Sequence, residues 1–216
     1  MKDRNYFIKK FNEWKREIWD YKYLIIFSLI TYVLATIIDY NSGIYVTFKA
    51  QVVNVPDLIL KYFGPIDFSF LFVWGFILVL FLFFLYPLFF NVKKIHIAIL
   101  QFSILTILRS IFIILTHLGT PNDAIPVVFP GIFNIVRFHN DQFFSGHVAI
   151  PFLGFLLFTE SKIKWLFLTG SIFLGIIVLA MHQHYSIDVF AAFFITYGSF
   201  KIGEWMLKKL KIFKIE

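Results

Sequence analysis

Two short polar segments interrupt the mainly apolar sequence, and each of them contains histidine. The first segment, NDQFFSGH, occupies residues 140–147 and stops where an apolar stretch begins. Ser145 is a favoured N-cap residue, so the segment predicts a helix that starts near Gly146 with His147 in its first turn. The free backbone amides of such a turn, with the positive end of the helix dipole, suit an anion such as phosphate. On its own, the segment is more typical of an ordinary capped helix with an interfacial histidine.

The second polar segment places a histidine and a carboxylate at helical spacing. It reads MHQHYSID and occupies residues 181–188, so that His184 and Asp188 are four positions apart. At this spacing two side chains lie on one face of a helix. A carboxylate bound to one imidazole nitrogen fixes the tautomer and leaves the other nitrogen to attack or to accept a proton. A surface His–Asp pair is the alternative, but a carboxylate at the edge of an apolar stretch is costly without a role.

Together the two segments contain the groups that an in-line displacement at phosphorus requires. One histidine would attack, the other would protonate the leaving oxygen, and backbone amides would hold the phosphoryl oxygens. The sequence has no cysteine, and its His, Asp and Glu residues show no recognisable metal-ligand spacing. The expected chemistry therefore uses neither a metal nor a cofactor.

The composition indicates what positions these groups. Of the 216 residues 59% are hydrophobic and 15% are charged, whereas a soluble domain rarely exceeds about half apolar residues. We therefore expect an all-α integral membrane protein. The net charge of +7 comes from basic residues between apolar stretches, so a membrane explains it better than a nucleic-acid partner.

Six apolar stretches approach the roughly 20 residues that cross a bilayer. They occupy residues 23–38, 68–90, 95–118, 146–158, 165–181 and 187–205, and the fourth is short. They predict a six-helix transmembrane catalytic domain over residues 23–207, followed by a basic tail, 208–216. In the N-terminal segment, residues 1–22, apolar side chains three or four apart predict an amphipathic helix at the membrane interface. A soluble juxtamembrane helix explains the same pattern equally well.

The distribution of basic residues predicts the orientation. Most of the 20 Lys and Arg residues precede the first stretch, follow the last one, or lie in the short connections after the second and fourth stretches. This asymmetry predicts that both termini are cytoplasmic. The long connections, residues 39–67 and 119–144, then lie on the non-cytoplasmic side with both polar segments. Within and near these connections we expect solvated carboxylates and a solvated imidazole, at Asp39, Asp57, Asp67, Asp123 and His139.

Both polar segments resemble the signature motifs of a known family. DQFFSGH at 141–147 and HYSIDV at 184–189 resemble those of the sphingomyelin synthase-related branch of the type 2 phosphatidic acid phosphatase superfamily. RSIFIILTHLGTP at 109–121 is similar to the Arg-containing motif of that branch. The resemblance covers residues 109–189 and implies six spans with the site on the non-cytoplasmic side.

The resemblance also implies roles for individual residues. His184 would be the nucleophile that forms a phosphohistidine, Asp188 would orient it, and His147 would act first as acid and then as base. Arg109 would contact the phosphoryl group or its surroundings. The expected phosphate-binding set is Arg109, Asp141, Ser145, Gly146 and His182.

The sequence also departs from the family pattern at several positions. Val148 stands where the branch usually has threonine, and Val178 stands where the wider superfamily has an arginine six residues before the second histidine. The Lys-x6-Arg-Pro motif of that superfamily is not found. The phosphate cradle must therefore differ, using Arg109, His182 or Arg137.

The expected substrate is a lipid phosphate or a phospholipid, and the acceptor stays open. Water as acceptor would make the chain a phosphatase, and a lipid hydroxyl would make it a phosphotransferase. The oligomeric state is open as well. A transporter or scaffold without catalysis is the alternative from another class, although inverted repeats typical of transporters are not evident. A serine protease using Ser145 would leave Asp188 and His147 unexplained.

Overall fold

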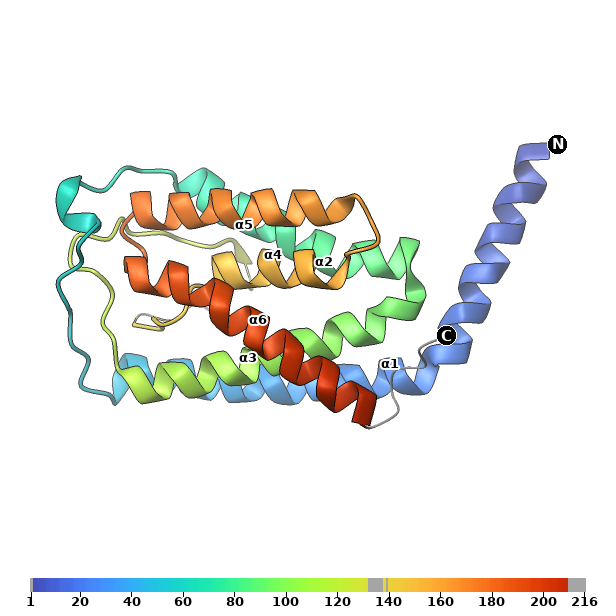
Figure 1. The fold of residues 1–216 in the computed structure, drawn as a ribbon, viewed down its shortest axis with the longest axis horizontal. Helices are drawn as coiled ribbons and strands as arrows, with labels where there is room; N and C mark the ends of the chain where they lie inside the picture. Colours follow the sequence, from blue (N-terminus) through green and yellow to red (C-terminus); the bar gives the residue numbers. More distant parts are fainter. Residues whose placement is uncertain (1, 132–137, 139, 210–216) are drawn as a thin grey trace.

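The computed structural model describes residues 2–131, 138 and 140–209, and this part of the chain is all-α. Its α-helices run along the long dimension of the molecule (Figure 1). They are α1 (Lys2–Phe48), α2 (Phe76–Phe90), α3 (Ile95–Thr116), α4 (Gly146–Leu157), α5 (Ile163–Ala180) and α6 (Ser186–Lys209). The described residues contain no β-strand beyond one isolated bridge, between Val53 and Leu118. The predicted all-α fold class is confirmed.

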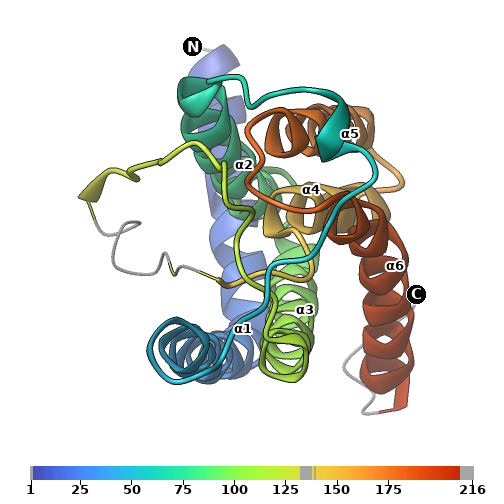
Figure 2. The same ribbon diagram turned by 90° about the vertical axis from the view of Figure 1, so that its left-hand side faces the viewer.

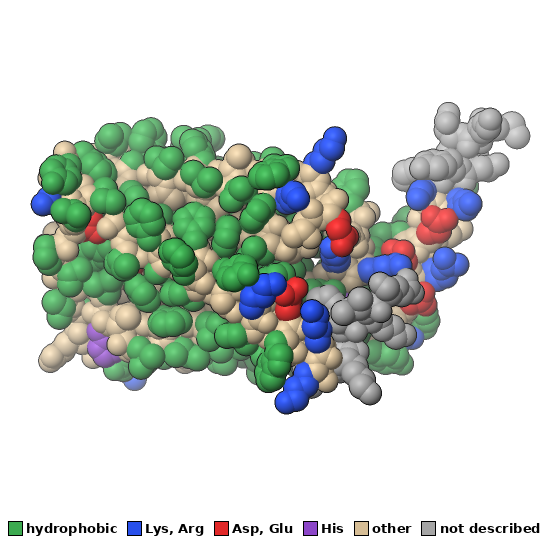
Figure 3. Space-filling view, viewed as in Figure 1, with side chains coloured by type: hydrophobic (Ala, Val, Ile, Leu, Met, Phe, Trp, Pro, Cys, Tyr) green, Lys and Arg blue, Asp and Glu red, His purple; other side chains and the backbone are tan. Residues whose placement is uncertain are grey.

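Each of the six predicted apolar stretches is found as a helix, but they differ in length. Among the described residues, four helical stretches are long and apolar enough to cross a membrane, namely Ile8–Phe48, Leu71–Phe90, Val92–Thr116 and Ile163–Ala180. α4 is an apolar helix of only 12 residues. The sides of the bundle are covered by hydrophobic side chains, whereas Lys and Arg gather at the end from which the N-terminal part of α1 projects (Figure 3). These features fit an integral membrane protein, and the sidedness of the termini stays a prediction.

The first helix is longer than its apolar stretch indicated. α1 is 47 residues long and continues through the boundary expected at residue 22 and past residue 38. The prediction that a loop starts at Asp39 is therefore wrong. Tertiary packing explains the extension, because Ala35, Ser42 and Val46 are buried along the face that packs against α3 (Figure 2). The N-terminal part of α1 leaves the bundle (Figure 1).

The loop after α1, the beginning of the loop after α3 and the turn between α5 and α6 lie at the opposite end of the bundle, which faces the viewer in Figure 2. The loop after α1 pairs with the loop after α3, where the Val53 N–H donates to the His117 carbonyl (3.1 Å). The Ile66 N–H donates to the Ala180 carbonyl (2.7 Å), and the Ile125 N–H donates to the Met181 carbonyl (3.1 Å). Both loops are thus fastened to the end of α5, directly before the second polar segment.

Candidate active site

The second polar segment forms the turn between α5 and α6, and it brings the predicted His–Asp pair together. The Nδ1 atom of His184 lies 3.2 Å from Oδ2 of Asp188, and both side chains are buried. The same Oδ2 accepts a hydrogen bond from the Tyr185 N–H (3.1 Å). His184 lies two residues before α6, so the turn, rather than a continuous helix, places the imidazole against the carboxylate. With Nδ1 held by Asp188, Nε2 is the nitrogen left for chemistry.

The first polar segment ends where α4 begins, as the sequence predicts. Ser145 occupies the N-cap position of α4 and is fully buried, but its side chain makes no capping hydrogen bond. The backbone carbonyl of Ser145 accepts a hydrogen bond from the Ala149 N–H (3.0 Å). Gly146 is the first residue of the helix and lines the cavity described below. The Val148 N–H also donates to the Ser145 carbonyl (3.3 Å), so the Gly146 amide at the helix start is the suitable donor for an anion.

The ring of His147 packs against two aromatic side chains from the segment that starts the second helical stretch. The centroid of His147 lies 4.0 Å from that of Phe72, with 26° between the ring planes. The corresponding values for Phe76 are 4.1 Å and 32°. Phe72 belongs to a single π-helical turn, Leu71–Gly75, and Phe76 is the first residue of α2. The stacked contact with Phe72 and the tilted contact with Phe76 limit the orientations that the imidazole can adopt.

Arg109 joins α3 to the first polar segment through several hydrogen bonds. Its Nη2 donates to the backbone carbonyl (2.9 Å) and to Oδ1 (2.5 Å) of Asp141, and its Nη1 donates to Oδ2 of Asp141 (3.2 Å). Its Nε donates to the Phe144 carbonyl (3.1 Å). A second carboxylate oxygen, Oδ1 of Asp39, lies 3.8 Å from Nη1. The guanidinium is therefore engaged with protein acceptors and holds residues 141–144 in place.

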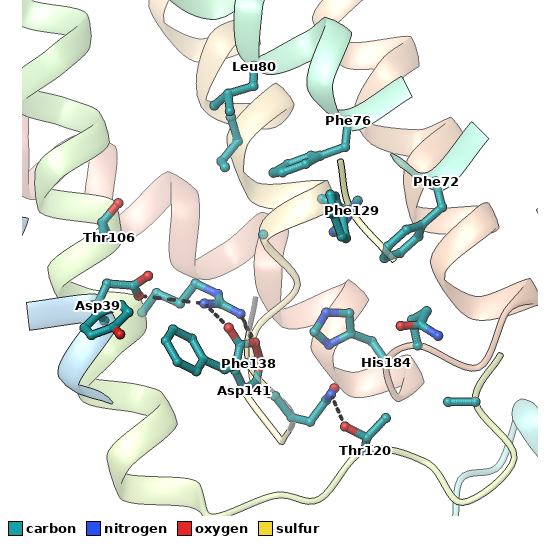
Figure 4. A pocket seen from close by; sticks show the side chains of 18 of the residues that line it. Asp39, Phe72, Phe76, Leu80, Thr106, Thr120, Phe129, Phe138, Asp141 and His184 are labelled. Atoms are coloured by element: carbon teal, nitrogen blue, oxygen red, sulfur yellow. Dashed lines mark hydrogen bonds and ion pairs between the residues drawn. The ribbon is translucent and has the colours of Figure 1, made fainter. Parts of the chain in front are cut away.

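A cavity of about 490 Å³ brings most of the predicted site residues together. Five of them line it, namely Arg109, Asp141, Gly146, His147 and His184. In Figure 4, Asp39, Asp141 and His184 lie toward one end of the cavity, and Leu80, Phe76 and Phe72 lie toward the other. The cavity thus joins a polar region to an apolar one that reaches between the helices.

Three predicted site residues do not line the cavity. Asp188 lies behind His184, and Ser145 is buried at the start of α4. His182 is buried with Nδ1 2.8 Å from Oδ2 of Asp123, and its ring packs edge-on against Phe63 (centroids 5.2 Å apart). His182 therefore joins two loops rather than reaching the cavity. Arg137, the other residue suggested for the cradle, and His139 lie outside the described residues.

Three carboxylates that were expected to be solvated take part in the architecture. Asp39 lies in α1, close to Arg109, and accepts a hydrogen bond from the Ser110 hydroxyl (3.1 Å). Asp57 contacts the start of α6, and Asp123 pairs with His182. Asp67 and Asp123 fit the expectation, because both are exposed, and Asp67 bonds locally to Ser69. Each unexpected contact joins distant parts of the chain, so neither periodicity nor motif spacing could have indicated it.

Comparison with known proteins adds one finding, which concerns the part of the chain that contains His147 and His184. Residues 140–205 match the family model described as PAP2 superfamily C-terminal. The match supports the predicted resemblance to the type 2 phosphatidic acid phosphatase superfamily. No curated protein and no solved structure matches the chain. The matched region contains His147, His184 and Asp188, and with the long apolar helices it suggests a membrane lipid phosphatase-type fold.

Proposed function

We propose that the chain is a membrane-embedded enzyme that transfers a phosphoryl or phospho-headgroup unit of a lipid through a phosphohistidine on His184. One observation carries the proposal. His147 and His184 line the same cavity, while Asp188 lies within hydrogen-bond distance of Nδ1 of His184. These are the nucleophile, the acid–base group and the orienting carboxylate of a covalent displacement.

In the first step Nε2 of His184 attacks phosphorus, and the bond between phosphorus and the leaving oxygen breaks. Asp188 holds the proton on Nδ1, so that the lone pair stays on Nε2, and stabilises the positive charge of the phosphorylated ring. His147, as imidazolium, gives its proton to the leaving oxygen. The products are a free lipid alcohol and a phosphohistidine.

In the second step an acceptor hydroxyl attacks the same phosphorus, and the bond between nitrogen and phosphorus breaks. His147, now neutral, takes the proton of the acceptor and returns to its starting state. Water as acceptor makes the reaction a hydrolysis, and a lipid hydroxyl makes it a headgroup transfer like that of the sphingomyelin synthase-related branch. The reaction is expected on the non-cytoplasmic face.

The Gly146 amide at the start of α4 is the proposed donor to the phosphoryl oxygens, since Gly146 lines the cavity. Arg109 acts on the surroundings, because its hydrogen bonds to Asp141 and Phe144 hold the segment before Gly146. The apolar wall with Phe72, Phe76 and Leu80 supports a lipid rather than a water-soluble phosphate ester.

The test is incubation of the purified protein with a panel of phospholipids and lipid phosphates, with separate measurement of phosphate, free headgroup and new lipid. After acid-free quenching, the wild-type protein should carry a base-stable, acid-labile phosphoryl group. His184→Ala should abolish both the label and turnover. His117→Asn is a matched control, because His117 does not line the cavity and asparagine tolerates its positive φ of 45°. Turnover by His184→Ala close to the wild-type rate would refute the proposal.

A further inference from the structure

The start of α6 is held by a carboxylate from a distant loop. Oδ2 of Asp57 accepts hydrogen bonds from the backbone N–H (2.7 Å) and from the hydroxyl (2.9 Å) of Ser186, the first residue of α6. Oδ1 of Asp57 accepts the N–H groups of Ile59 (2.7 Å) and Leu60 (3.0 Å). One side chain thus ties the loop after α1 to a helix 129 positions further along the chain.

A helix start needs such acceptors, because the N–H groups of its first turn have no partner within the helix. The residue before the helix usually supplies the acceptor from a short side chain. Here that residue is Tyr185, whose hydroxyl oxygen lies at the far end of the ring. This oxygen accepts a hydrogen bond from the Val55 N–H (3.3 Å). Asp57 takes over the capping role, and its negative charge also suits the positive end of the helix dipole.

The ionised form of Asp57 is favoured in this position. Partial burial raises the pKa of its carboxyl, but the hydrogen bonds from Leu60, Ser186 and Ile59 outweigh this effect, so the pKa lies below its usual value. The cap is therefore a carboxylate at neutral pH.

Ser186 lies midway between His184 and Asp188 in the sequence, so the cap lies in the turn that carries both residues. The Tyr185 N–H is held by Asp188, and the next N–H along the chain is held by Asp57. We propose that Asp57 is a positioning residue, which fixes this turn so that the His184 imidazole stays against Asp188 and directed at the cavity. The catalytic part of this inference rests on the proposed function. Asp57 itself does not line the cavity.

Replacement of Asp57 should therefore affect the chemical step more than substrate binding. In Asp57→Ala we expect kcat to fall by about tenfold to a hundredfold, because small misplacements of reacting groups have effects of this size. KM should change little. Asp57→Asn keeps one oxygen acceptor and should restore part of the lost kcat. Ser186→Ala removes half of the contact, and its effect on kcat should not add to that of Asp57→Ala.

Asp67 provides the matched control in the same loop. Its Oδ1 accepts the N–H (2.8 Å) and the hydroxyl (2.6 Å) of Ser69, so it makes a similar local cap, and both hydrogen bonds stay within its own loop. Asp67→Ala should leave kcat and KM unchanged. Equal losses of kcat in Asp57→Ala and Asp67→Ala would show a general effect of the loop and would overturn the proposal.

A second measurement does not depend on activity. Hydrogen exchange of the amides in residues 181–190 should become faster in Asp57→Ala and not in Asp67→Ala. Faster exchange together with reduced kcat supports the proposal, whereas unchanged exchange, or faster exchange with unchanged kcat, overturns it. Full turnover in His184→Ala would instead refute the proposed function, and the exchange comparison would still decide whether Asp57 holds the start of α6.

Discussion

The backbone N–H of Ser145 donates a hydrogen bond to the backbone carbonyl of Asp188, with 3.2 Å between nitrogen and oxygen. This contact joins the start of α4 directly to the first turn of α6. The two histidines belong to these two starts, His147 one residue inside α4 and His184 two residues before α6. Their relative position is thus set by the main chain as well as by side chains.

Asp188→Asn should preserve the packing of this buried position and still remove most of the activity. An amide does not hold the Nδ1 proton or stabilise the charged ring as a carboxylate does, so the wrong tautomer of His184 becomes accessible. By analogy with catalytic His–Asp pairs elsewhere, we expect kcat to fall by about a thousandfold or more. Steady-state kinetics on the purified variant measures this loss, and a thermal melt shows that the variant is folded. A loss of only a few fold would argue against the orienting role.

Arg109→Lys should destabilise the protein, because lysine lacks the planar group that reaches Asp141 and the Phe144 carbonyl together. A loss of about 1–3 kcal/mol in the free energy of unfolding is expected from the unsatisfied acceptors. The double variant Arg109→Gln/Asp141→Asn should recover part of the stability, since both charges are removed together. Unfolding in detergent measures the effect. Unchanged stability with weaker substrate binding would instead indicate direct contact with the phosphoryl group.

Phe72→Ala should loosen the His147 ring, which stacks on Phe72 and packs at a tilt against Phe76. The lost ring–ring interaction is worth about 0.5–1.5 kcal/mol beyond burial, and we expect kcat to fall roughly tenfold as the acid–base group samples other orientations. Phe72→Tyr keeps the ring and serves as the control. Comparison of a short-chain with a long-chain substrate separates this effect from acyl-chain binding. Equal kcat values for Phe72→Ala and Phe72→Tyr would contradict the prediction.

The cap on α6 should make stability depend on pH in a defined direction. Because the pKa of Asp57 is lowered in the folded protein, its ionised carboxyl stabilises the fold above the unfolded-state value of about 4. This contribution disappears as the pH falls through the folded-state pKa. The difference in melting temperature between wild type and Asp57→Ala should therefore be full at neutral pH and shrink below about pH 4. A difference that grows on acidification would mean that the sign is wrong.

Local patterns in the sequence were sufficient for the helices and for the His184–Asp188 pair. Apolar stretches predicted each helix, because a backbone in lipid must satisfy its N–H and C=O groups internally and a helix does so. The interval of four residues predicted the contact between His184 and Asp188, although a turn rather than a helix makes it. The start of α4 at Gly146 followed from the N-cap preference of Ser145.

Long-range contacts were not predictable in the same way. The extension of α1 to Phe48 depends on burial against α3, and polar residues such as Asp39 and Ser42 gave no apolar signal there. The capping of Ser186 by Asp57 joins loops whose sequences contain no shared pattern. His182 was expected near the phosphate because of its motif, but its pairing with Asp123 turns it toward the loops.

The shortness of α4 determines how deep the reaction centre lies. Its 12 residues extend about 18 Å, whereas the hydrocarbon core of a bilayer is roughly 30 Å thick. If α4 stood perpendicular to the bilayer with the charged loop after it, which includes Glu160 and Lys162, at one edge of the hydrocarbon core, its first residue would lie roughly 12 Å inside the opposite edge. A substrate lipid would then have to sink its phosphate below its neighbours' headgroups, or the bilayer would have to thin around α4.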